Sequence, residues 1–105
     1  PGESSAKIRA RVESARKKQA QRFGGESRSN AHLRAREIRQ HCSLNTEGAS
    51  LLQSAVQTLH LSARAYDRIL KVARTIADLE AAEQIEPAHL HEAISYRSLD
   101  RTIWA

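Results

Sequence analysis

The segment from Leu61 to Glu80 constrains the fold of this 105-residue chain more than any other segment does. Ser62 is a good helix N-cap, because its hydroxyl can accept a hydrogen bond from a first-turn N–H that has no partner within the helix. Leu61 and Tyr66 occupy the two positions of a hydrophobic staple around that cap. Spacings of three and four then mark one buried helical stripe, formed by Tyr66, Ile69, Leu70, Ala73, Ile76 and Ala77. The segment predicts a long amphipathic helix that packs against a core.

Arg64 stands at a position of this helix where electrostatics disfavour a cation. It is the second helical residue, at the end where the backbone dipoles carry a positive partial charge. A local rule broken within an otherwise consistent helix tends to mark a functional site. We therefore interpret Arg64, together with the free N–H groups of the first turn, as a site for an anion such as phosphate. The alternatives are an ion pair with a neighbouring helix, or a side chain that simply lies in water.

Polar residues continue from Arg64 along the same helix. Arg68, Lys71, Thr75 and Asp78 form this stripe, and we expect it to face solvent or a seam with another domain. Arg74 lies off the stripe, where it can reach an acidic neighbour, and we expect its role to be structural.

Composition predicts an all-α fold with a single small core. Aromatic residues make up only 4% of the chain while 40% of it is apolar, which favours a helical bundle over a β-sandwich. Two prolines and four glycines leave long uninterrupted stretches for about five helices. We divide the chain into a basic N-terminal helix with a Gly/Ser loop, residues 1–29, and a helical bundle, residues 30–105.

The first helix is expected to run from Ser4 or Ser5 to Phe23 and to end at Gly24-Gly25. Its apolar stripe is thin, so we expect it to gain little from docking and to fray or to pack only against another domain. The second helix is predicted to begin at an Asn30 cap and to end near Cys42. Its expected inner face consists of Ala31, Ala35, Ile38 and Cys42.

A third helix is predicted from about Thr46 to Leu59. The tight connection at His60-Leu61 should make it a neighbour of the Arg64 helix. Pro87 suits the first position of a last helix, and Ile85 is expected to anchor the preceding loop to the core. Beyond that helix, Ile103 and Trp104 need cover from this domain or another, and their exposure would favour a protein-interaction adaptor.

Charge is unevenly distributed along the chain. Residues 1–42 hold eleven Lys/Arg against four Asp/Glu, whereas residues 43–105 hold six against eight. The excess of positive charge in residues 1–42 predicts an anionic partner on one side of the domain. The candidate contacts to nucleic acid or to another domain are Arg16, Lys17, Lys18 and Arg22. A stand-alone nucleic-acid-binding module that uses residues 1–42 is the alternative function, and a plain solvated face is the third interpretation of this charge.

The Arg64 helix also resembles a known family. The run from Leu61-Ser62-Ala63-Arg64 through Ala73-Arg74-Thr75-Ile76-Ala77-Asp78-Leu79 is similar to the C-terminal helical domain of magnesium-chelatase-like AAA+ ATPases, in particular the ComM/YifB branch of Mg-chelatase-related competence proteins. Supporting residues are Glu3-Ser4-Ser5, Arg9, Val12, Ala15-Arg16, Gln19 and Arg22-Phe23 upstream, and Ile85, His89, Glu92-Ala93 and Tyr96-Arg97 downstream. The resemblance covers nearly the whole chain.

This resemblance implies that Arg64 is a sensor-2 arginine that reaches the γ-phosphate of ATP. The nucleotide and its Mg²⁺ would be held by a preceding P-loop domain, and residues 30–105 would form a lid over it. The family further implies a ring, a hexamer in the full-length protein, and DNA remodelling during uptake and recombination of DNA. The basic first helix would then meet the ATPase domain or the next protomer. The isolated chain is expected to be monomeric and to bind no cofactor by itself.

Other classes of function find little support in the sequence. The chain has no glycine-rich loop that ends in Gly-Lys-Ser/Thr, so we do not expect it to be an enzyme by itself. His89 and His91 are two residues apart and point to different sides of a helix, which argues against a metal site. No run approaches the ~20 apolar residues that cross a bilayer. The single cysteine, Cys42, rules out an intrachain disulfide and fits a reducing, cytoplasmic setting.

Overall fold

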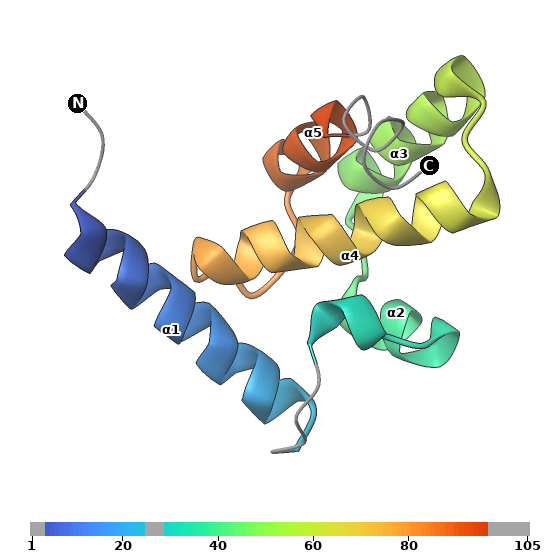
Figure 1. Cartoon of the computed structure of the whole chain (residues 1–105). Helices are drawn as coiled ribbons and strands as arrows, with labels where there is room; N and C mark the ends of the chain where they lie inside the picture. The colour runs from blue at the N-terminus through green and yellow to red at the C-terminus, as the bar shows by residue number, and fades with distance from the viewer. Residues whose placement is uncertain (1–3, 25–28, 97–105) are drawn as a thin grey trace.

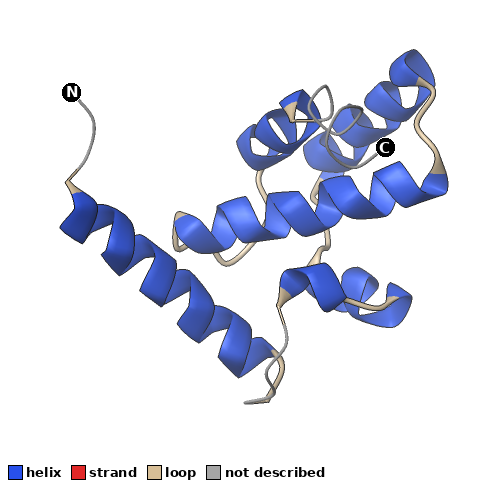
Figure 2. Ribbon diagram, viewed as in Figure 1, coloured by secondary structure: helices blue, strands red, loops and turns tan. Residues whose placement is uncertain are grey.

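The structure is a computed structural model, and it describes residues 4–24 and 29–96. Five α-helices and one short 3₁₀-helix account for most of these residues, and Figure 2 shows no strand arrow among them. In chain order they are α1 (Ser5–Arg22), η1 (Asn30–His32), α2 (Ala35–His41), α3 (Thr46–Leu59), α4 (Ala63–Leu79) and α5 (Pro87–Ser95). The predicted all-α bundle of about five helices is confirmed.

Helix α4, the Arg64 helix, forms the centre of the bundle. In Figure 1, α5 and α3 lie on one side of it, whereas α1 and α2 lie on the other. Its apolar stripe is buried as predicted from Ile69 onward, and Ala73 and Ala77 are completely inaccessible. Tyr66 was wrongly assigned to this stripe, because its side chain is 38% exposed. It lies near the start of α4, before the part of the helix that the neighbouring elements cover.

The prediction of one continuous helix from Asn30 to Cys42 was wrong. The chain forms η1, then takes an extended conformation at Leu33 and Arg34 before α2 begins. Ala31 and Ala35, which were expected on the inner face, are exposed, whereas Leu33 at the break is buried. Burial of Leu33 and of the Asn30 side chain therefore overrides the local preference for a helix, while Ile38 and Cys42 are buried as expected.

Helices α3 and α5 have the predicted starting points, but α3 has a different neighbour. The Asn45 side chain caps α3 by accepting from the Gly48 N–H at 2.7 Å, and His60 ends it in the left-handed conformation with φ 53°. The helix then packs chiefly against α5 and makes few contacts with α4, contrary to expectation. A Cβ at Gly48 would lie 3.2 Å from Leu90 Cδ1, so the small residue permits this close approach.

The loop between α4 and α5 is anchored as the sequence predicts. Ile85 is 1% exposed and forms an isolated parallel bridge with Leu44. Pro87 occupies the first position of α5. The tail that contains Ile103 and Trp104 lies outside the described residues.

Helix α1 docks more firmly than its thin apolar stripe suggested. Ala15 and Phe23 are 3% and 6% exposed, and the helix packs directly against α4. Ile8, nearer the N-terminus, is 45% exposed. The expectation of a helix that packs only against another domain was wrong, because polar contacts made by the C-terminal end of α1 supplement its apolar face.

Cys42 carries a free thiol. Cys42 is buried, and this burial raises the pKa of its thiol to about 11. Such a thiol behaves as a small apolar side chain. Over residues 4–24 and 29–96, no helix combines the length and the apolar character needed to cross a membrane.

Candidate functional site

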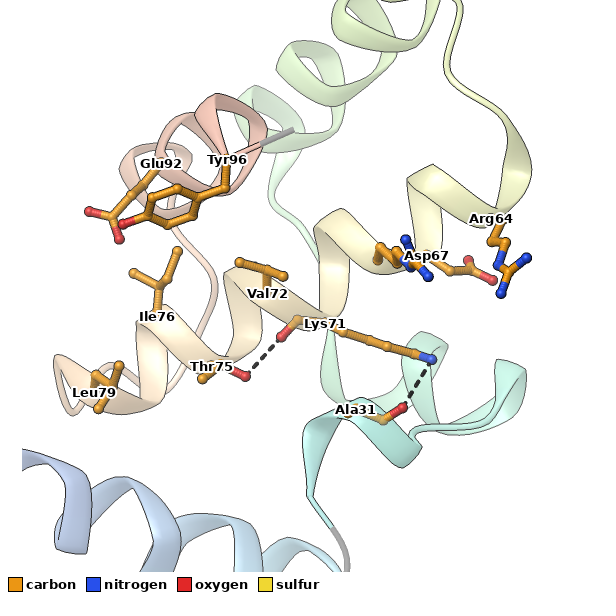
Figure 3. A pocket seen from close by; sticks show the side chains of 11 residues that line it. Ala31, Arg64, Asp67, Lys71, Val72, Thr75, Ile76, Leu79, Glu92 and Tyr96 are labelled. Atoms are coloured by element: carbon orange, nitrogen blue, oxygen red, sulfur yellow. Dashed lines mark hydrogen bonds between the residues drawn. The ribbon is translucent and has the colours of Figure 1, made fainter. Parts of the chain in front are cut away.

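A groove of 790 Å³ runs along the face of α4 that carries Arg64. Figure 3 shows Glu92 of α5 and Tyr96, the residue after α5, on one side of the groove and Ala31 of η1 on the other. The α4 side chains that line the groove are of two kinds. The cations Arg64, Arg68 and Lys71 come from the N-terminal half of the helix, and the apolar residues Val72, Ile76 and Leu79 follow in its C-terminal half.

Arg64 lines this groove at the start of α4. The Ser62 hydroxyl accepts from the Ala65 N–H at 3.1 Å, as the sequence predicts for an N-cap. Since the first N–H groups of a helix have no partner within it, those of Ala63 and Arg64 stay available. The Arg64 side chain is exposed, and Figure 3 shows it at the start of α4 among the residues that line the groove. It makes no hydrogen bond or ion pair with another residue that the structure describes.

The other two cations extend the positive end of the groove. Arg64, Arg68 and Lys71 are spaced by four and three residues, which places them on one face of α4. The Lys71 ammonium donates to the Ala31 carbonyl at 3.3 Å, so η1 fixes its position. Like charges at this spacing repel one another. A bound anion would relieve that repulsion, and only Asp67 and Glu92 offset it among the lining residues.

Asp78 is not on the solvent-facing stripe that the sequence predicted. Its side chain is completely buried, and its Oδ2 and Oδ1 accept from the two terminal nitrogens of Arg22 at 2.9 Å each. Asn30 Nδ2 donates to the same carboxylate at 2.9 Å, and Arg74 Nη2 lies 3.1 Å from it. The carboxylate therefore joins α1, η1 and α4. Sequence reasoning missed this cluster because its partners lie 48 and 56 residues away.

Arg22 and Arg74 both serve this internal cluster. Arg22 was predicted to contact nucleic acid or another domain, but its guanidinium pairs with Asp78 and also donates to Asn30 Oδ1 at 2.8 Å. Arg74 is buried, and it donates to the carbonyl oxygens of His41, Ala82 and Glu83. The predicted structural role of Arg74, including its acidic partner, is confirmed.

The pKa of Asp78 lies below its ordinary value. Burial alone would raise it, but the hydrogen bonds from Arg22 and Asn30 and the charges of Arg22 and Arg74 outweigh this effect. Since the folded pKa is depressed, the ionised carboxylate contributes stability that is complete above the unfolded pKa of about 3.9. This contribution disappears as the pH falls through the lower folded pKa.

A pH titration of stability tests this assignment. We expect the difference in unfolding free energy between the wild type and Asp78→Asn to be large at about pH 7 and to shrink below about pH 4. Urea unfolding at both pH values measures it. Asp67→Asn, which changes an exposed carboxylate, should differ little from the wild type at either pH. A difference between the wild type and Asp78→Asn that stays constant down to about pH 2 would contradict the assignment.

The histidines form no metal-binding cluster in the described ranges. His89 is buried and His91 is exposed, so the two point to different sides as predicted. The His89 Nδ1 accepts from the Glu86 N–H at 2.9 Å, which assigns the ring proton to Nε2, 3.1 Å from Glu80 Oε1. This histidine thus caps the start of α5.

Of the four basic candidates in α1, three stay available to a partner outside the bundle. Arg16 and Lys17 are exposed and Lys18 is half-buried. Helix α2 adds the exposed Arg36 and Arg39. Because α1 and α2 both lie on the side of α4 away from α3 and α5 (Figure 1), the basic first part of the chain gathers on one side of the bundle.

Comparison with known proteins places the chain in a family. The family described as magnesium chelatase, subunit ChlI C-terminal, matches residues 2–97. The chain is 48% identical over 103 residues to the uncharacterized protein YifB of Escherichia coli (strain K12), and this covers 98% of the chain and 20% of YifB. It is 46% identical over 102 residues to the competence protein ComM of Haemophilus influenzae, covering 97% of the chain and 19% of ComM. The chain thus spans about a fifth of the length of these relatives. It belongs to the magnesium chelatase ChlI C-terminal family, as a domain of the ComM/YifB type.

Proposed function

We propose that this domain is the lid of an AAA+ ATPase and that Arg64 is its sensor-2 residue. The observation that carries the proposal is the exposed guanidinium of Arg64 at the start of α4, without a partner among the described residues. Its planar donors can bind two phosphate oxygens at once. The free N–H groups of Ala63 and Arg64 add donors and a positive partial charge at the same end of the helix.

The groove fits a polyphosphate better than it fits a metal ion. Arg64, Arg68 and Lys71 supply three cations along one face, while Asp67 and Glu92 are the only carboxylates among its lining residues. We therefore assign phosphate contacts to this domain, and ATP with its Mg²⁺ to a preceding P-loop domain. When the lid closes, Arg64 stabilises the charge on the terminal phosphate and excludes water beside it.

The proposal extends to the protein that carries this domain. Since one relative is named as a competence protein, we propose that the ATPase acts in DNA processing during competence, in the cytoplasm. We further propose a hexameric ring in which the domain contacts the AAA+ core and a neighbouring protomer. The test is ATP hydrolysis by an Arg64 variant of the full-length protein.

Binding of nucleic acid by the basic side of the bundle is the second candidate function. It is favoured by the exposed cations of α1 and α2, which lie on one side of α4. These cations can contact phosphates without reading the sequence, and such binding weakens steeply as salt is added.

Fluorescence anisotropy with a labelled DNA duplex tests this candidate on the 105-residue chain. We expect binding with a dissociation constant of about 10⁻⁶ to 10⁻⁴ M that weakens as salt rises. Lys17→Glu combined with Lys18→Glu should abolish it. The matched control reverses two residues of the opposite side, Glu86→Lys with Glu92→Lys, and should not weaken it. Absence of binding at low salt would eliminate this function.

A further inference from the structure

The internal cluster around Asp78 and the groove are connected through one residue, Asn30. Its Nδ2 donates both to Asp78 Oδ2 at 2.9 Å and to Thr75 Oγ1 at 3.1 Å. Thr75 lines the groove and donates its hydroxyl to the Lys71 carbonyl at 3.0 Å. The next residue, Ala31, accepts from the Lys71 ammonium. Asn30 therefore contacts the cluster, and Ala31 contacts a cation of the groove, as Figure 3 shows.

Helix α1 holds this connection in place from the other side. Arg22 donates to Asn30 Oδ1 at 2.8 Å, and the side-chain oxygen of Gln19 accepts from the Asn30 N–H at 3.0 Å. Asn30 is 1% exposed, so these bonds form away from competing water. Helix α1 thus adds two hydrogen bonds to Asn30, while η1 also packs directly against α4.

The buried carboxylate of Asp78 also has a cationic partner on its own helix. Asp78 is contacted by two arginines, of which Arg22 belongs to α1 and Arg74 to α4 itself. If Arg22 withdraws, Arg74 still neutralises the buried carboxylate. Apolar contact on α1 is limited mainly to Ala15 and Phe23, while Ile8 is exposed. Arg22 is therefore the main polar attachment of a helix in which Ala15 is the only buried residue.

We propose that Arg22 is a positioning residue for the cationic groove, so that docking of α1 sets the affinity of the groove for a polyphosphate. With α1 docked, Asn30 and Thr75 are fixed and the Lys71 ammonium is held at the groove, which lowers the entropy lost on binding. With α1 undocked, η1 and Lys71 lose this support. The inference rests on the proposed function, since it concerns regulation of the same groove.

Tripolyphosphate binding to the 105-residue chain, followed by NMR at the amides of Arg64 and Lys71, tests the coupling. We expect Arg22→Gln to weaken binding about fivefold or more, a coupling of ordinary size between two sites. Arg9→Gln is the matched control, because it removes the same charge from an exposed position of the same helix. This control should weaken binding less than Arg22→Gln does. Binding by Arg22→Lys should be intermediate between Arg22→Gln and the wild type, because lysine cannot form the bidentate pair with Asp78.

A second measurement avoids any dependence on the stability of the Arg22 variant. Coupling between two sites is reciprocal, so tripolyphosphate should slow hydrogen exchange of α1 amides from Val12 to Arg22 in the wild type. Thr75→Val removes the hydroxyl between Asn30 and Lys71, and it should reduce this slowing, whereas Thr58→Val on the exposed surface of α3 should not.

The outcomes separate this inference from the proposed function. Saturable binding that depends on Arg64, with equal losses in Arg22→Gln and Arg9→Gln and with unchanged exchange in α1, overturns the coupling alone. Absence of saturable binding at Arg64 overturns the anion site, and the coupling falls with it. Slower exchange in α1 that persists in Arg64→Gln would likewise overturn the coupling, because the ligand would then act from another site.

Discussion

Replacing Arg64 with alanine in the full-length protein is expected to reduce the rate of ATP hydrolysis about a hundredfold or more. This is the usual loss when one preorganised donor to developing charge is removed. Steady-state phosphate release, measured at saturating ATP, gives the effect on kcat. Arg64→Lys should recover only part of the rate, because an ammonium cannot present two parallel donors to phosphate oxygens.

Two controls separate a lost phosphate contact from a damaged fold. Arg64 is exposed, so Arg64→Ala should change the unfolding free energy of the domain by no more than about 0.5 kcal/mol. Arg36→Ala removes another exposed cation, from α2, and should leave hydrolysis unchanged. Turnover by Arg64→Ala at the wild-type rate would reject the sensor-2 assignment.

Replacing Asp78 with asparagine is expected to cause the largest loss of stability in the domain, about 3–5 kcal/mol. The variant leaves two guanidinium groups, of Arg22 and Arg74, close together without the buried carboxylate that neutralises them. For a domain of this size, such a loss lowers the melting temperature by more than about 12 °C. Urea unfolding of the 105-residue chain, followed by circular dichroism, measures the change in free energy.

The relative losses of unfolding free energy in three variants distinguish a buried network from an ordinary ion pair. Arg22→Gln should be less damaging than Asp78→Asn, because Arg74 still balances Asp78. Asp67→Asn, at an exposed position of the same helix, should stay within about 0.5 kcal/mol of the wild type. A loss below about 1 kcal/mol for Asp78→Asn would be no larger than that of a surface salt bridge. It would show that the buried network does not stabilise the domain as proposed.

Local signals in the sequence were sufficient for the starts of α3, α4 and α5 and for the exposed part of the candidate site. The Ser62 and Asn45 caps and the first-position Pro87 each act within one helical turn, so they predict where α4, α3 and α5 begin. The same locality places Arg64 at the start of α4, with its side chain outside the apolar stripe.

Tertiary structure decided everything that depends on distant partners. Asp78 shares the polar stripe of α4 with Lys71, yet it is buried, because Arg22 and Asn30 reach it from segments 56 and 48 residues away. The break at Leu33 has the same cause, since burial of that side chain outweighs local helix preference. Periodicity describes which residues share a face of one helix. It does not specify which other segments cover that face, and in this domain their charges and their burial determine whether a polar residue contacts solvent or the interior.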